Sequence, residues 1–168
     1  MRPSSNRFVT STHPRLSRLV AKHIFPMSPF AAWMHDSGVA VDLWNHARHS
    51  SYLIQNYPIW GLDQREVLLA AMVAYLHEGD PPPSDWKRQY LPILGNRDLE
   101  LAVKLGAILE AAEVVGTARP RFSLPPGGRS LAVSFSTDDD ASLSPRWLEK
   151  LRRPMGRAFD LEVRSRDA

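Results

Sequence analysis

The segment over residues 63–76 places the strongest constraint on the fold. Asp63 is the predicted N-cap of a helix, and the helix that follows is apolar around most of its circumference. Such a helix buries nearly all of its surface and therefore belongs in the middle of a helical bundle. Its apolar residues are Val67, Leu68, Ala70, Ala71, Val73, Ala74 and Leu76. The Gly and Pro residues over 79–83 end the helix in an exposed loop.

Further segments of the chain show apolar residues at helical spacing. They lie over residues 14–24, 30–35, 41–56, 86–94 and 98–116. In the helix predicted over 41–56, the inward face includes Leu43, Ala47 and Ile54. Residues 1–13 are rich in Ser, Thr, Arg and Pro, so we expect an irregular arm there.

The sequence pattern changes after residue 116. Apolar and polar residues alternate over 121–124 and 130–136, on either side of a Pro-Gly turn, which predicts a β-hairpin. A helix then begins with Pro145 at its first position. Alternation over 159–163 predicts a closing strand.

These patterns divide the chain into three regions. They are an N-terminal arm over 1–13, a helical bundle over 14–116 and a small α/β unit over 117–168. The predicted fold class is therefore mainly α, with a helical bundle followed by a β-β-α-β unit. A length of 168 residues fits one domain with a small appendix.

The composition excludes several classes of protein. The chain has no Cys, which rules out disulfide scaffolds, Cys-ligated zinc and thiol nucleophiles. No apolar run reaches the roughly 18 residues that a membrane span needs, and the N-terminus lacks the apolar core of a secretory signal. We therefore expect a cytoplasmic protein that does not contact a membrane.

Positive charge is distributed unevenly along the chain. The formal net charge is only +3, but residues 2–22 carry basic side chains and no acidic one, and residues 146–166 are rich in Arg. Basic termini favour anionic partners such as phosphates or nucleic acid.

His35 and Asp36 form the first candidate site. A His-Asp pair at the end of a helix is the pair that His-Asp metallophosphohydrolases use to hold a divalent ion, which lowers the pKa of a bound water. A complete site also needs a His from an earlier helix and an acid from a later one. His13 and His23 are the candidates for the first, and Glu113 is the nearest substitute for the second.

His46, Arg48 and His49 form the second candidate site. The two histidines are three residues apart, so they share a side of the helix predicted over 41–56. Two imidazoles so placed can ligate one metal, can face a phosphate when protonated, or can be structural. Arg48 adds a forked donor suited to phosphate oxygens. His77 lies at the end of the central helix. The helix dipole stabilises a charged histidine there, so a structural role is enough to explain this residue.

The segment around these residues resembles one protein family. The run from His46 to Asn56, His-Ala-Arg-His-Ser-Ser-Tyr-Leu-Ile-Gln-Asn, is similar to the signature helix in the C-terminal domain of the exopolyphosphatase / guanosine-pentaphosphate phosphohydrolase (Ppx/GppA) family. The preceding segment, Ala32 to Gly38, resembles the family's preceding helix. Segments at 61–66, 71–77 and 105–109 follow in the expected order.

The resemblance implies an HD-like helical domain that follows two actin-like domains. Those domains hold the family's phosphate-binding loops, catalytic acid and magnesium site, and this chain shows none of their glycine-rich motifs. The chain therefore looks like the C-terminal domain alone, either a fragment or a stand-alone protein. In the family this domain binds polyphosphate and forms a dimer interface.

The resemblance also assigns roles to the candidate residues. His46, Arg48 and His49 would face polyphosphate or another phosphate anion, in binding that weakens with salt and with rising pH. The domain would hold no cofactor, because the family's metal site at positions such as His35 and Asp36 is usually incomplete.

Two alternatives remain open. The first is an independent HD-type metal-dependent phosphohydrolase, with His35 and Asp36, and with His46 and His49 as further candidates, holding a divalent metal. The second is a structural homodimerisation module that binds neither metal nor phosphate.

Overall fold

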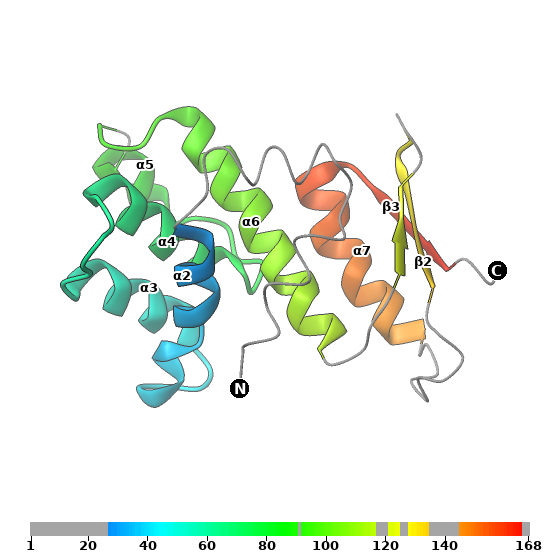
Figure 1. The fold of residues 1–168 in the computed structure, drawn as a ribbon, viewed down its shortest axis with the longest axis horizontal. Helices are drawn as coiled ribbons and strands as arrows, with labels where there is room; N and C mark the ends of the chain where they lie inside the picture. The colour runs from blue at the N-terminus through cyan, green and yellow to red at the C-terminus, as the bar shows by residue number, and fades with distance from the viewer. Residues whose placement is uncertain (1–26, 91, 117–120, 125–127, 135–144, 166–168) are drawn as a thin grey trace. The chain divides into compact units, whose positions relative to one another are not determined.

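The computed structural model describes residues 27–90, 92–116, 121–124, 128–134 and 145–165 (Figure 1). The helical elements are α2 (Met27–Met34), the short 3-10 helix η2 (Ser37–Ala40), α3 (His46–Asn56), α4 (Gln64–Leu76), α5 (Ser84–Tyr90), α6 (Asn96–Val115) and α7 (Pro145–Phe159). The strands are β1 (Arg121–Ser123), β2 (Ser130–Ser134) and β3 (Glu162–Ser165). The mainly α class, with a helical bundle followed by a β-β-α-β unit, is confirmed. The arm predicted over 1–13 and the helix predicted over 14–24 lie outside the described residues.

The chain divides into two compact units, Met1–Gly106 and Ala107–Ala168. The division falls inside α6, whereas the sequence pattern places the change of character at residue 116. No helix among the described residues is long and apolar enough to cross a membrane.

Helix α4 occupies the centre of the first unit, as its sequence predicts. It packs against both α2 and α3, and every residue from Val67 to Ala74 is buried. Its start is fixed by a capping box. The Asp63 carboxylate accepts the backbone N–H of Glu66, and the Glu66 carboxylate accepts the backbone N–H of Asp63.

Helix α3 begins at His46, not at residue 41, so the longer helix predicted from the sequence is wrong at its start. The physical reason is Asp42, whose carboxylate accepts the backbone N–H of Trp44 at 3.1 Å and the side-chain amide of Asn45 at 2.6 Å. The hydrogen bond from Asn45, together with the weaker effect of the one from Trp44, holds the pKa of Asp42 below its usual range. Local bonding of this kind competes with a helix. Leu43, predicted to point inward, is 61% exposed.

The 3-10 helix η2 lies directly against α3. The buried backbone N–H of Gly38 donates to the Ser50 hydroxyl at 2.8 Å, and both residues are buried. This bond holds the segment after α2 against the second turn of α3. It therefore sets the position of His35 and Asp36, which precede Gly38, relative to His46.

A bidentate ion pair joins α4 to α6 within the first unit. The Asp98 carboxylate, in the first turn of α6, accepts Arg65 Nε at 3.0 Å and a short second hydrogen bond from Arg65 Nη2. It also accepts the backbone N–H of Gly95 at 3.1 Å. Asp98 is only 6% exposed. Its hydrogen bonds raise the pKa of Arg65.

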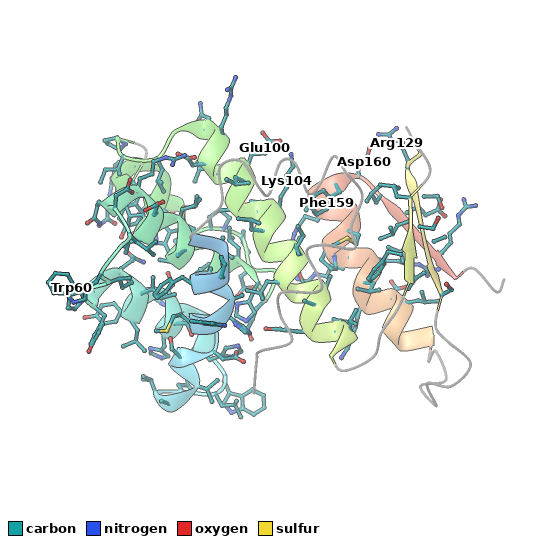
Figure 2. The ribbon with its side chains drawn as sticks, viewed as in Figure 1. Trp60, Glu100, Lys104, Arg129, Phe159 and Asp160 are labelled. Atoms are coloured by element: carbon teal, nitrogen blue, oxygen red, sulfur yellow. The ribbon has the colours of Figure 1, made fainter. Side chains whose placement is uncertain are left out.

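The second unit has its own small core. Its sheet has the order β1-β2-β3, with β1 antiparallel and β3 parallel to β2, and α7 makes the crossover that a parallel pair requires. The buried residues are Ala111, Val115, Leu131, Val133, Leu151, Met155 and Val163. Asp160, with φ of 55°, turns the chain from α7 into β3 and forms an ion pair with Arg129 (Figure 2).

Candidate functional site

Four side chains of the first unit meet where α2, α3 and α4 approach one another. His35 and Asp36 follow the last residue of α2, His46 opens α3, and His77 is the residue after Leu76 at the end of α4. One potential ligand atom from each of His35, Asp36 and His77 lies within 4.8 Å of the others. We call these four residues the imidazole cluster. Two of them, His35 and Asp36, are the predicted metal-site pair.

The backbone fixes the tautomer of three imidazoles in the same way. His35 Nδ1 lies 2.8 Å from the carbonyl oxygen of Ala32, and His77 Nδ1 lies 2.6 Å from that of Ala74. His46 Nδ1 lies 3.0 Å from the carbonyl oxygen of Leu43. A carbonyl oxygen can only accept, so each Nδ1 carries the proton. Each Nε2 of a neutral ring then carries a lone pair.

The Nε2 atoms converge with the Asp36 carboxylate. His46 Nε2 lies 3.3 Å from His77 Nε2 and 3.4 Å from Asp36 Oδ1. His35 Nε2 lies 3.4 Å from Asp36 Oδ2. The rings of His35 and His77 meet edge to face, with centroids 5.1 Å apart. Ring nitrogens from three helices and one carboxylate are therefore gathered at one place.

The cluster is buried on one side and open on the other. His77 is 0% exposed, and the side chains of His35 and His46 are 15% and 16% exposed. Asp36 is 59% exposed, so the carboxylate forms the solvent side of the cluster. Glu78 Oε1 lies 3.3 Å from His46 Nδ1 at the rim. The solvent-facing side of the cluster is therefore the Asp36 side.

The predicted phosphate-facing residues are only partly brought together. His46 turns into the imidazole cluster, whereas Arg48 is exposed and His49 is half-buried. Residues two apart on an α-helix are about 200° apart around it, so His46 and Arg48 occupy opposite flanks of α3. His13 and His23 lie outside the described residues. Glu113 belongs to the second unit, on α6.

Sequence reasoning missed His77 as a site residue. A signal was present, because His77 ends the most apolar helix of the chain, and a histidine there is placed at the heart of the bundle. His77 is fully buried, so it is close to the other rings of the cluster and not at the surface.

The chain is a helical-bundle domain followed by a small α/β unit, and its bundle carries the imidazole cluster. Comparison with known protein families matches residues 3–126 to Ppx/GppA phosphatase, domain III. The chain therefore belongs to the Ppx/GppA phosphatase family and corresponds to its C-terminal domain, which confirms the resemblance seen in the sequence. A comparison with curated proteins found no match.

Proposed function

We propose that this chain is the non-catalytic C-terminal domain of a Ppx/GppA-type phosphohydrolase, which binds polyphosphate or another phosphate anion and forms a homodimer. The observation that carries the proposal is the domain III match over residues 3–126. Upstream actin-like domains would supply the hydrolytic chemistry. The chain would add affinity for the polymer and hold two copies of the enzyme together.

The exposed side of α3 supports anion binding. Arg48 is exposed and forms no ion pair with any residue that the structure describes, so its guanidinium is available to phosphate oxygens. His49 is one residue further along and half-buried. Charge-assisted hydrogen bonds from Arg and protonated His to phosphate are stronger than neutral ones.

Replacing Arg48 and His49 together with alanine is expected to weaken polyphosphate binding by at least about tenfold. Each hydrogen bond to a charged group contributes about 1.5–3 kcal/mol, and 1.4 kcal/mol corresponds to a tenfold change. Calorimetric titration of the intact chain with long-chain polyphosphate measures the effect. Arg88→Ala, which removes an exposed charge from α5, is the matched control. Equal affinity of the double variant and the wild type would refute the role of these two residues.

Exposed aromatic side chains on α3 and in the segment that follows it support dimerisation. Tyr52, Tyr57 and Trp60 are 63%, 70% and 96% exposed, and Trp60 projects outward from the described residues of the first unit (Figure 2). Aromatic side chains are enriched in the centres of protein interfaces. A second copy of this chain that covers these residues would remove a large apolar area from water.

The double variant Tyr52→Ser/Trp60→Ser is expected to raise the dimer dissociation constant by at least about tenfold without lowering the thermal midpoint of a monomeric sample. The reason is that exposed side chains contribute little to folding but much to an interface. Light scattering over a concentration series measures the change. Trp33→Ser, at an exposed Trp of α2, is the control. A wild-type chain that remains monomeric at high concentration would contradict the proposed dimer.

The imidazole cluster favours a second candidate function, that of a metal-dependent phosphohydrolase. When bound beside a phosphate, a divalent metal supplies an activated water and charge stabilisation. Release of orthophosphate from phosphomonoesters, nucleotides or polyphosphate by the isolated chain is the test of this candidate. The proposal above predicts no such release.

A further inference from the structure

We propose that His35, Asp36, His46 and His77 form a binding site for one divalent transition-metal ion. The inference concerns binding alone and goes beyond the proposed role in anion binding. It does not require that the chain hydrolyse anything. The ligand set differs from the one that the sequence suggested, because it adds His77 from α4 and leaves out His49.

The three imidazoles share one tautomer, which favours metal binding. Their Nδ1 atoms lie 2.8, 3.0 and 2.6 Å from the carbonyl oxygens of Ala32, Leu43 and Ala74, each three residues earlier in the chain. Metal-ligating histidines typically donate their other ring N–H to a backbone carbonyl or a carboxylate, which fixes the ring and raises the basicity of the ligating nitrogen. All three rings of the cluster are held in this way.

The spacing of the donor atoms also fits a metal ion. Two donors that each lie about 2.1 Å from one ion, with an angle of about 90–110° between them, are about 3.0–3.4 Å apart. The observed separations are 3.3 Å between the Nε2 atoms of His46 and His77, and 3.4 Å from Asp36 to both His35 and His46. The side chains are therefore placed as neighbours in one coordination sphere.

Charge also favours a cation at this position. His46 Nε2 and His77 Nε2 lie 3.3 Å apart, a hydrogen-bond distance, so a single proton bridges only these two rings. A divalent ion attracts three Nε2 atoms and a carboxylate oxygen together. Since His77 is 0% exposed and the other two rings are 15% and 16% exposed, water screens this attraction only from the Asp36 side.

The ligand chemistry indicates which metals fit. Imidazole suits zinc, copper, iron and nickel, whereas calcium and magnesium prefer oxygen ligands. Three imidazoles and one carboxylate therefore select a transition metal. The exposed carboxylate leaves a solvent-facing side from which water or a phosphate oxygen could complete the coordination.

Calorimetric titration of the full chain with Zn²⁺ and with Co²⁺, after chelator treatment and without a polyhistidine tag, tests the proposal. We expect one ion per chain, and a loss of affinity of more than about 100-fold in Asp36→Asn and His46→Gln. Mg²⁺ is expected to bind far more weakly than either ion. Asp80→Asn, at an exposed carboxylate in the loop after α4, is expected to bind as the wild type does.

Folding must be separated from binding in this experiment. His77→Gln alters a fully buried residue and is expected to destabilise the fold. The two partly exposed positions, Asp36 and His46, therefore carry the test, with folding checked by circular dichroism. Wild-type affinity for Zn²⁺ equal to that of folded Asp36→Asn and His46→Gln would overturn the site. Retained metal binding in a chain that binds no polyphosphate would leave this inference standing and refute the proposed anion-binding function.

Discussion

Replacing Gly38 with alanine is expected to destabilise the first unit by about 3 kcal/mol, because overpacking a close backbone contact costs about 1–3 kcal/mol or more. A Cβ at residue 38 would meet the carbonyl oxygen of His46, the backbone nitrogen of Ser50 at 2.5 Å and His49 Cβ at 2.7 Å. Two of these atoms belong to the backbone of α3. Relief of the clash would therefore require the whole helix to move, and the buried bond from Gly38 to the Ser50 hydroxyl would be strained or lost.

Chemical denaturation followed by circular dichroism measures this effect. The control is Gly95→Ala, where the nearest atom to the added Cβ is a carboxylate oxygen of Asp98 at 4.0 Å. A Gly38→Ala chain as stable as Gly95→Ala would show that η2 does not pack on α3 as described. We expect the same variant to lose the imidazole cluster. A shift of α3 would move His46, its first residue, away from Asp36.

Asp98→Ala is expected to cost about 2 kcal/mol of unfolding free energy. The change removes the acceptor of two hydrogen bonds from Arg65 and one from the backbone N–H of Gly95, which precedes α6. Hydrogen bonds to charged groups contribute about 1.5–3 kcal/mol. The estimate stays near the lower end because the Arg65 side chain is 47% exposed and regains water when its partner is lost.

The matched control for this ion pair lies on the same helix. Glu100 and Lys104 form an exposed pair four residues apart on α6 (Figure 2). Glu100→Ala is expected to leave the denaturation midpoint nearly unchanged, since exposed ion pairs contribute little. If Asp98→Ala is as harmless as Glu100→Ala, the Arg65 ion pair does not fasten α4 to α6.

The elements that the sequence predicted well are those whose local signals agree with their environment. Helix α4 has a capping residue, Asp63, and apolar residues on nearly all sides, and it is found capped and buried. The alternation and the proline start in the last third predicted the β-hairpin, α7 and β3, and all are present. The closing strand begins later than predicted, because Phe159 still belongs to α7 and β3 starts at Glu162. Both signals are local, so a single sequence is sufficient to detect them.

The start of α3 could not be predicted in the same way. The apolar pattern at Val41 and Leu43 continues the helical spacing, but the carboxylate of Asp42 captures the following N–H groups and both apolar side chains remain exposed. Periodicity does not distinguish an apolar residue that faces the core from one that faces solvent. Exposed Leu43 and Trp44 instead add to the apolar surface of the first unit.

The imidazole cluster was predicted in part. His35 and Asp36 are adjacent in sequence, so their pairing was visible, but the partnership of His46 with His77 joins residues 31 positions apart. Only the packing of α3 on α4 brings them together. Arg48 is close to His46 in sequence but not on the same side of the helix. The sequence suggested a shared surface, but two residues along an α-helix point to opposite sides of it.

We propose that the chain binds phosphate polymers without cleaving them. The most direct measurement is to incubate the purified chain with long-chain polyphosphate, with and without Mn²⁺, and to determine bound polymer and released orthophosphate in the same samples. We expect saturable binding that weakens with added salt and no orthophosphate above the protein-free control. Release of orthophosphate that is lost in Asp36→Asn would show that the chain cleaves phosphate bonds, and the absence of any bound polymer would refute the anion-binding role.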